Sequence, residues 1–521
     1  MSTAVITQPV SRARSLALLA REHVPPVTLI SLLTLLALPV HGYHPFAEDG
    51  GLYAAGIKHL LRPELYPHSL PFVEAHLRFS LFAPAVASFV RLTHLSLETA
   101  LLALYLGGLW LTLFAVWMLA SRCFESRAAR SGSVLLFAAW LTMPVAGTSI
   151  ILVDPYLTAR SLSFPCALLA LSFGLDFLCP DALSSERLRS ALACLAALGV
   201  AAAVHPLMAS YALADLLLLA AILSPLRRWL VPALCLASFV AAGVLYRNAP
   251  TTPADYTQAA LSRTYWFLSE WHWYEVVGLI APLLLLLPVA NPLRKLSTPR
   301  QALASMAILS GVTAIALSLV FAHTNSASYA IARLQPLRAF QLVYGVMILF
   351  LGAALGKHLL RNNPLRMTAA FLLLAAPFPI AQHTTYPSSA PIEWPGAEPR
   401  NAWQQAFLWI RTQTPLDALF ALDADYISHH GEDAQCFRAL AERSALPDFS
   451  KDGGETAITP DLSAAWAAGQ SAQHHLSNED DAHRIAALRP LHVHWLVLEQ
   501  QAATGLPCPY NNAQVKVCRL P

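Results

Sequence analysis

The stretch LETALLALYLGGLWLTLFAVWMLA, residues 97–120, decides the fold class of this chain. Its only charged residue is Glu98, near the start, and a helix needs about 20 such apolar residues to cross a bilayer. Comparable runs recur along the 521 residues, of which 56% are hydrophobic and 12% charged, and the mean hydropathy is +0.49. We therefore predict a polytopic α-helical membrane protein in contact with the lipid bilayer.

The apolar runs predict about 11 membrane spans. We place them at residues 24–42, 97–120, 133–151, 161–179, 190–204, 207–223, 229–246, 273–290, 301–322, 338–356 and 367–381. A further stretch, 77–92, is short and contains Arg78, Pro84 and Arg91. If it crossed, most Lys and Arg residues would fall on the wrong side of the membrane. We expect it to lie in the membrane plane, within a first external loop of residues 43–95.

The same charge bias predicts an N-terminus on the inside and a C-terminal part on the outside. Residues 1–381 then form the transmembrane domain, and the Pro- and Ser-rich residues 382–400 form a linker. Residues 401–521 alternate helical and strand-like segments, which predicts a soluble α/β domain. In a bacterium, the protein would lie in the cytoplasmic membrane with this domain in the periplasm.

Charge and cysteine content exclude several classes of site. A net charge of +3 does not favour a nucleic-acid partner. None of the 8 cysteines forms a C-x-x-C motif, so zinc and thioredoxin-type sites have no support. Cys508 and Cys518 could pair in an oxidising compartment, although Cys436 would remain unpaired, so this pairing stays open.

The segment HPFAEDGGLYAAGIKHLL, residues 44–61, places two acids directly after the first span. Glu48 and Asp49 precede two glycines, so the backbone there can come close to a ligand. A second acid, Asp154, follows the third span within VDPYLTARSL and is expected at membrane depth, where ionisable groups often mark a site. Carboxylates can act as general bases, and a pair of them can hold a divalent cation.

Polar residues on the same outer side could complete a binding site. Arginine suits phosphate because its planar fork can donate two hydrogen bonds. The candidates are Tyr53, Arg160, His205, Arg333 and Arg338. For each of them a solvated loop is the simpler interpretation. For His205, which precedes Pro206, the simpler interpretation is a break between two helices.

The layout resembles the GT-C superfamily of polyprenyl-phosphate-dependent glycosyltransferases. It is similar to bacterial aminoarabinose and mannosyl transferases and to the catalytic subunit of oligosaccharyltransferase. The resemblance is carried by HPFAEDGGLYAAGIKHLL, by LRFSLFAPAVASFVRLTHLSLETALL, by ILVDPYLTARSLSF and by FLWIRTQTPLDALFA. The second acidic loop departs from the family pattern, because it has one Asp rather than D-x-D.

The resemblance implies transfer of a sugar from a polyprenyl-phosphate donor to a glycan, lipid or protein acceptor of the cell envelope. Asp49 or Glu48 would be the general base, and Arg333 or Arg338 would bind the donor phosphate. Asp154 would orient the acceptor or, with Asp49, bind Mg²⁺ or Mn²⁺. Two alternatives remain open: a GT-C-like scaffold without activity, and a lipid or solute transporter.

Overall fold

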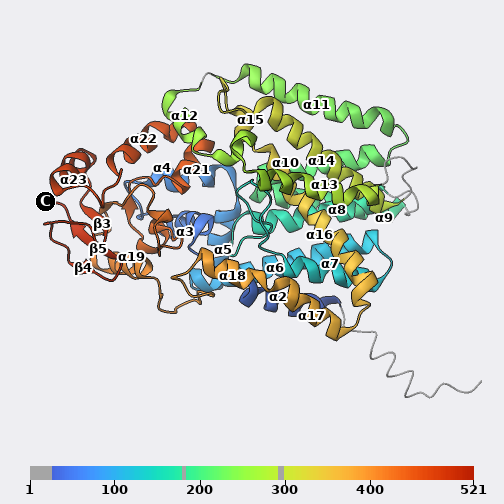
Figure 1. Cartoon of the computed structure of the whole chain (residues 1–521), viewed down its shortest axis with the longest axis horizontal. Coiled ribbons are helices and arrows are strands. Elements are labelled where there is room, and N and C mark those ends of the chain that lie inside the picture. The colour runs from blue at the N-terminus through green and yellow to red at the C-terminus, as the bar shows by residue number, and fades with distance from the viewer. Residues whose placement is uncertain (1–25, 179–183, 251, 291–297) are drawn as a thin grey trace, which may run out of the picture.

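A helical bundle and a C-terminal domain at one end of it make up the protein (Figure 1). The computed structural model describes residues 26–178, 184–250, 252–290 and 298–521. Arg12, Arg14 and Arg21, which contribute to the predicted orientation, lie outside these residues. The bundle helices are α2 (Pro26–His41), α6 (Leu97–Cys123), α7 (Arg127–Ala139), α8 (Arg160–Leu178), α9 (Ser184–Val204), α10 (Pro206–Leu223), α11 (Arg227–Asn248), α13 (Trp273–Ala290), α14 (Pro299–Phe321), α16 (Phe340–Leu355), α17 (Pro364–Ala375) and α18 (Pro377–Thr385).

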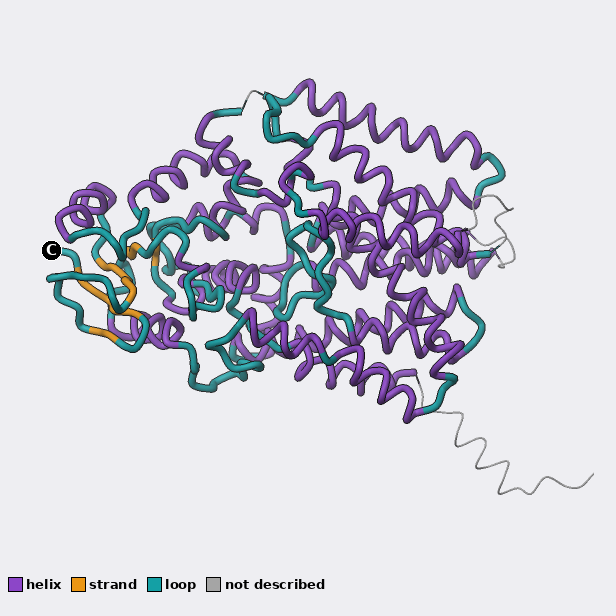
Figure 2. Tube along the Cα trace, viewed as in Figure 1, coloured by secondary structure: helices purple, strands orange, loops and turns teal. Residues whose placement is uncertain are grey.

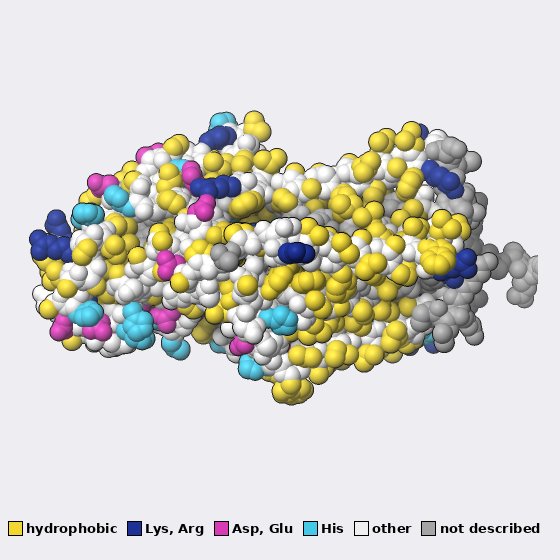
Figure 3. All heavy atoms as spheres, turned by 90° about the horizontal axis from the view of Figure 1, so that it is seen from above, with side chains coloured by type: hydrophobic (Ala, Val, Ile, Leu, Met, Phe, Trp, Pro, Cys, Tyr) yellow, Lys and Arg dark blue, Asp and Glu magenta, His cyan; other side chains and the backbone are white. Residues whose placement is uncertain are grey.

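The bundle has the length and surface of a membrane domain. Within the described residues, nine helical stretches are long and apolar enough to cross a bilayer, and α2 is a shorter apolar helix. Figure 3 shows hydrophobic side chains covering the bundle, whereas charged side chains and histidines gather over the C-terminal domain. The predicted class, a polytopic helical membrane protein, is confirmed.

The predicted span 133–151 is wrong in its extent. Helix α7 ends at Ala139, and the chain then folds back on itself before α8 begins. The Val145 amide donates to the Ile150 carbonyl at 3.0 Å, and the Leu152 amide donates to the Met143 carbonyl at 2.9 Å. A buried apolar hairpin and an apolar helix have the same composition, so the sequence could not distinguish them.

Close packing of α7 against α16 forms the centre of the bundle. A Cβ atom built on Gly132 would lie 2.3 Å from the Gly352 carbonyl oxygen, and one on Gly356 would lie 2.0 Å from the Ala128 carbonyl oxygen. Small residues let two helices approach this closely. Gly352 and Gly356 are therefore packing residues between α7 and α16.

The first loop folds into short helices where the bundle meets the C-terminal domain. These are α3 (Glu48–Leu61), α4 (Leu70–Glu74), η1 (His76–Phe79) and α5 (Phe82–Thr93). Helix α5 has 12 residues, too few to span a bilayer. It buries Phe82 and Val86 and leaves Leu92 exposed. The orientation of α5 in the membrane plane stays a prediction.

Two later loops add short elements at the same end of the bundle. They are α12 (Ala254–Leu261), η2 (Thr264–Trp266) and η3 (Leu268–Glu270), then α15 (Ala330–Arg333) and η4 (Pro336–Ala339). Helix α16 runs directly into η5 (Gly356–Leu360).

A five-stranded sheet organises the C-terminal domain, and the described strands all lie there (Figure 2). The order is β2 (Ser444–Ala445), β1 (Leu419–Ala421), β3 (Trp495–Glu499), β5 (Val515–Arg519) and β4 (Tyr510–Asn511). The pairs β2–β1 and β1–β3 are parallel, whereas β3–β5 and β5–β4 are antiparallel. The helices are α19 (Ala402–Gln413), η6 (Tyr426–Ser428), α20 (Phe437–Ala441), α21 (Lys451–Ile458), η7 (Pro460–Leu462), α22 (Ser463–Ala472), α23 (Asp481–Leu488) and η8 (Arg489–Leu491). The predicted α/β domain is confirmed.

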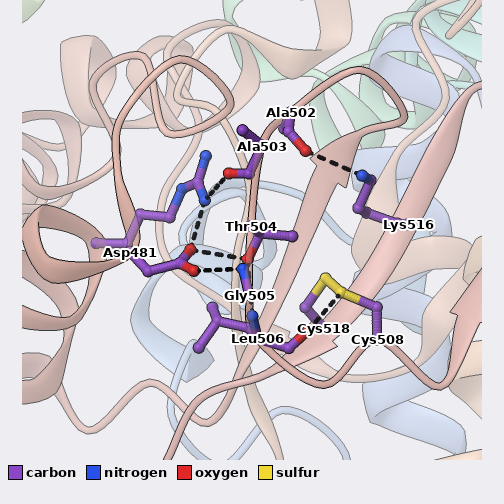
Figure 4. The surroundings of a disulfide bond; sticks show 10 residues. Asp481, Ala502, Ala503, Thr504, Gly505, Leu506, Cys508, Lys516 and Cys518 are labelled. Carbon is purple, nitrogen blue, oxygen red and sulfur yellow. Dashed lines mark hydrogen bonds and ion pairs between the residues drawn. A yellow bond between two sulfur atoms is a disulfide. The ribbon is translucent and has the colours of Figure 1, made fainter.

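A disulfide between Cys508 and Cys518 closes the edge of this sheet (Figure 4). Next to it, the Asp481 carboxylate accepts hydrogen bonds from the Thr504 hydroxyl and the Gly505 amide, both at 2.7 Å. The pairing that the sequence left open is present, and Cys436 is a free, buried thiol.

Direct contacts hold the C-terminal domain against the first loop. Glu442 forms ion pairs with Lys58, at 2.8 Å, and with Arg62. The Tyr66 hydroxyl donates to the Arg438 carbonyl at 2.9 Å, and the Glu48 amide donates to the Ala434 carbonyl at 2.8 Å. These bonds hold α20 and the residues on either side of it against α3 and the loop that follows α3.

Candidate functional site

The acid pair lies at the start of α3, wedged between two other parts of the chain. A Cβ atom on Gly50 would lie 2.9 Å from the Tyr156 side chain, and one on Gly51 would lie 2.2 Å from Cys436 Cβ. The glycines therefore make room for the second acidic loop and the C-terminal domain. The sequence predicted that these glycines would let a ligand come close to the backbone. In the structure, the space beside them is filled by the Tyr156 and Cys436 side chains.

Arg160, the first residue of α8, joins the two acidic loops. Its Nη2 atom lies 2.9 Å from Asp49 Oδ2 and 2.9 Å from Asp154 Oδ2. The Thr158 hydroxyl also donates to Asp154 Oδ2, at 3.0 Å. The Asp154 side chain is 3% exposed and that of Asp49 is 35% exposed. The buried Asp154 therefore orients the Arg160 guanidinium. The carboxylate of Asp49 is the one that solvent or substrate can reach.

Lys451, at the start of α21, reaches the same acids from the C-terminal domain. Its ammonium lies 3.2 Å from Asp49 Oδ1 and also forms an ion pair with Glu48. Burial would raise the pKa of Asp49, but Lys451 and Arg160 hold it well below its usual range. Asp49 is therefore a permanent carboxylate that holds cations. The sequence did not single out Lys451, because a lone lysine 402 residues after Asp49 carries no motif.

Arg338 faces this network without a carboxylate of its own. In the part of the chain that the structure describes, no ion pair joins Arg338 to an acid, and its buried Nε atom has no hydrogen-bond partner. Its guanidinium carbon stacks 5.5 Å from the centre of the Tyr265 ring. The charge of Arg338 acts on Asp49, so the two lie in one electrostatic neighbourhood.

Of the remaining predicted residues, His205 and Tyr53 lie beside this network and Arg333 does not. His205 caps α10 by accepting from the Met208 amide at 3.4 Å, and burial together with Arg160 and Arg338 lowers its pKa to about 3. It is therefore a neutral helix cap beside the site. Tyr53 lies on α3, one turn after Asp49. Arg333 instead lies against the Tyr256 hydroxyl, and no ion pair joins it to the predicted acids among the described residues.

The site does not have the form of a metal centre. The described residues contain no group of three or more His, Cys, Asp or Glu side chains placed to hold a metal ion. The guanidinium of Arg160 lies between Asp49 and Asp154, where a divalent cation would have to bind. The expected Mg²⁺ or Mn²⁺ does not fit this arrangement.

Comparisons with known proteins were made on sequence and on fold. No protein-family model and no curated protein sequence matches the chain. Among solved structures, the chain is similar to the apo oligosaccharyltransferase of Archaeoglobus fulgidus, at 12% identity and a TM-score of 0.49, over 92% of this chain and 70% of that one. It is also similar to ArnT from Cupriavidus metallidurans, apo and bound to undecaprenyl phosphate.

The two ArnT structures are 16% and 15% identical, with TM-scores of 0.38 and 0.39, and each match covers 98% of both chains. Likeness at these identities and TM-scores carries no argument about activity, so function is argued from the site.

Proposed function

We propose that the chain is a glycosyltransferase that moves a sugar from a polyprenyl-phosphate donor to an acceptor of the cell envelope. The observation that supports this most is the guanidinium of Arg338, which has no ion pair with any of the described acids and lies beside acids whose own cations are already engaged. An arginine fork without a carboxylate is suited to a phosphate monoanion or diester. The position at one end of a membrane bundle suits a phosphate carried on a lipid.

Each element of the network has a role in this proposal. Arg338 binds the donor phosphate and stabilises the charge that develops on it as the glycosidic bond breaks. Asp154 holds Arg160, and Arg160 with Lys451 holds Asp49 in the reacting region. A carboxylate of the site removes a proton from the attacking hydroxyl or amine, which leads to inversion at the anomeric carbon, and the sequence resemblance assigns that role to Glu48 or Asp49. Tyr53 and His205 form the adjoining wall.

We place the protein in the bacterial cytoplasmic membrane with residues 401–521 in the periplasm. The positive-inside bias and the disulfide between Cys508 and Cys518 support that placement, since disulfides persist in oxidising compartments. The domain limits 1–381, 382–400 and 401–521 belong to the same proposal.

The test is release of undecaprenyl phosphate from a panel of synthetic pentosyl, hexosyl and aminosugar undecaprenyl phosphates. The full chain, in nanodiscs, is mixed with each donor and with extracted envelope lipids and glycans, and products are read by mass spectrometry. Asp49→Asn should slow release by about 10²-fold or more, as for loss of an important catalytic carboxylate.

The matched control is Glu64→Gln, an exposed acid of the same first loop. Failure of every donor, or an Asp49→Asn rate equal to that of the control, would overturn the glycosyltransferase proposal. The scaffold or transporter alternatives would then be preferred.

A further inference from the structure

A second titratable pair lies beside the acid network and has no role in it. Glu455 follows Lys451 by four residues on α21, so both side chains project from one face of that helix. Opposite Glu455 stands His76, from η1 of the first loop, with Nδ1 at 3.9 Å from Glu455 Oε1. Both side chains are buried, at 10% and 8% exposed.

Among the described residues, the surroundings of His76 supply no hydrogen-bond partner for either nitrogen of its imidazole ring. The Tyr53 ring meets the His76 ring edge-on at 5.0 Å, and a Cβ atom on Gly56 would lie 2.8 Å from Nε2. Gly56 therefore leaves the room that this imidazole occupies. Buried polar groups are normally satisfied, and an exception calls for a functional explanation.

The charges around Glu455 favour its protonated form. Burial and then the charges of Asp452 and Asp49 raise its pKa to about 8. Burial also lowers the pKa of His76 to about 4, against the opposing charge of Asp49, so His76 is neutral at neutral pH.

Among the described residues no Lys or Arg forms an ion pair with Glu455: Lys58 of α3 is paired with Glu442, Glu74 of α4 lies against His59, and Arg263 donates to the Ser450 and Phe449 carbonyls. Helix α22 carries no charged residue, and Tyr256 of α12 donates its hydroxyl to the Ala457 carbonyl. Asp461 of η7 is exposed. Lys451 is engaged by the acid pair. Glu455 is thus an acid without a positive partner, in contrast to Asp49.

Asp49 and Glu455 are therefore suited to two different roles in the same site. A carboxylate held between Lys451 and Arg160 is a weak base, since protonation would break two ion pairs. A general base works best when its pKa lies near the working pH. Glu455 meets that condition and Asp49 does not.

We propose that Glu455, positioned by His76, accepts the proton of the attacking group, so that neither Glu48 nor Asp49 is the base and Asp49 serves to hold Arg160 and Lys451 in place. The inference rests on the glycosyltransferase function proposed above. The acceptor oxygen or nitrogen forms a bond to the anomeric carbon, and the bond from that carbon to the phosphate oxygen breaks. Its electron pair leaves with the lipid phosphate, and the acceptor proton passes to the Glu455 carboxylate, from which it is lost to water.

The test compares Glu455→Gln and His76→Asn with the wild-type chain in nanodiscs, across pH 6 to 10, a range spanning the pKa of Glu455 at about 8. The probes are undecaprenyl phosphate for binding and the active glycosyl donor for transfer. The control is Glu479→Gln, an exposed acid of the same domain.

Wild-type kcat should rise with pH and level off above about 8, the pKa of Glu455. Glu455→Gln should lower kcat by about 10²-fold and abolish that rise, with undecaprenyl phosphate affinity unchanged. His76→Asn should move the midpoint of the rise, which loss of packing alone would not do. Infrared titration should also find a protonated carboxyl in the wild type that Glu455→Gln lacks.

Two results would overturn the inference. If Glu455→Gln keeps both its rate and its alkaline rise while the wild type transfers sugar, another group accepts the proton and the proposed function stands. If the wild type neither binds undecaprenyl phosphate nor uses any donor, both proposals fall together.

Discussion

Replacing Arg338 by Met tests the part of the site on which the proposed function depends most. Methionine keeps an apolar stem of similar length beside Tyr265 but removes the charged fork. The neighbouring cations cannot take over, because Arg160 and Lys451 are held by carboxylates at distances of 2.9 and 3.2 Å. The change should therefore act on phosphate binding rather than on folding.

The magnitude follows from the bonds that are lost. A hydrogen bond to a charged group contributes about 1.5–3 kcal/mol net. Each 1.4 kcal/mol corresponds to about a tenfold change in Kd. Arg338→Met should thus weaken binding of undecaprenyl phosphate by about 10- to 150-fold. Arg338→Lys should lose less, because it keeps the charge and loses the planar fork.

The assay is equilibrium binding of undecaprenyl phosphate to the protein in nanodiscs, at low and high salt. Arg333→Met is the matched control, from the same loop, and should leave Kd unchanged because Arg333 lies against Tyr256. Equal losses for the two variants would mean that general positive charge attracts the lipid. An unchanged Kd for Arg338→Met would refute the assignment of this guanidinium to phosphate.

Three further predictions concern stability, each read by thermal unfolding of the nanodisc-bound chain. Asp154→Asn should cost about 1.5–3 kcal/mol, since the buried Arg160 loses one charged partner; an unchanged Tm would argue against the pair. Glu442→Gln should cost about 3–5 kcal/mol by leaving Lys58 buried without its carboxylate. Burial opposes ionisation of Glu442, but Lys58 holds its pKa below the ordinary 4.5, so this stabilisation is complete above pH 4.5 and is lost as pH falls below it. Cys508→Ser should cost about 2–3 kcal/mol for so short a loop, and reduction should lower the wild-type Tm but not that of the variant.

Features of the site that are close to a membrane span could be predicted from the sequence. The acid pair, Asp154 and Arg160 follow apolar runs on one side of the membrane, and that topology places them together. The choice between Arg333 and Arg338 could not be made, since both lie in one loop. Gln335 between them takes a left-handed backbone, with φ of 49°, and the two arginines meet different partners.

Features that depend on distant parts of the chain could not be predicted. Lys451 and Glu455 stand in an ordinary polar segment, and only the tertiary fold brings them to the first loop. In the C-terminal domain, the sequence reveals the two longer strands: β3 is a continuous apolar run, and β5 begins with an alternating pattern. The two-residue strands β2 and β4 are too short to leave any periodicity.

The packing of α21 on the first loop also sets the order in which the proposed site is assembled. Glu48 and Asp49 are synthesised early, whereas Lys451 and Glu455 lie within about the last seventh of the chain. A nascent bundle that has already inserted its helices still has an acid pair without its lysine. The proposed site is therefore completed in one late step, when the C-terminal domain folds onto the membrane domain and Lys451 reaches the acid pair.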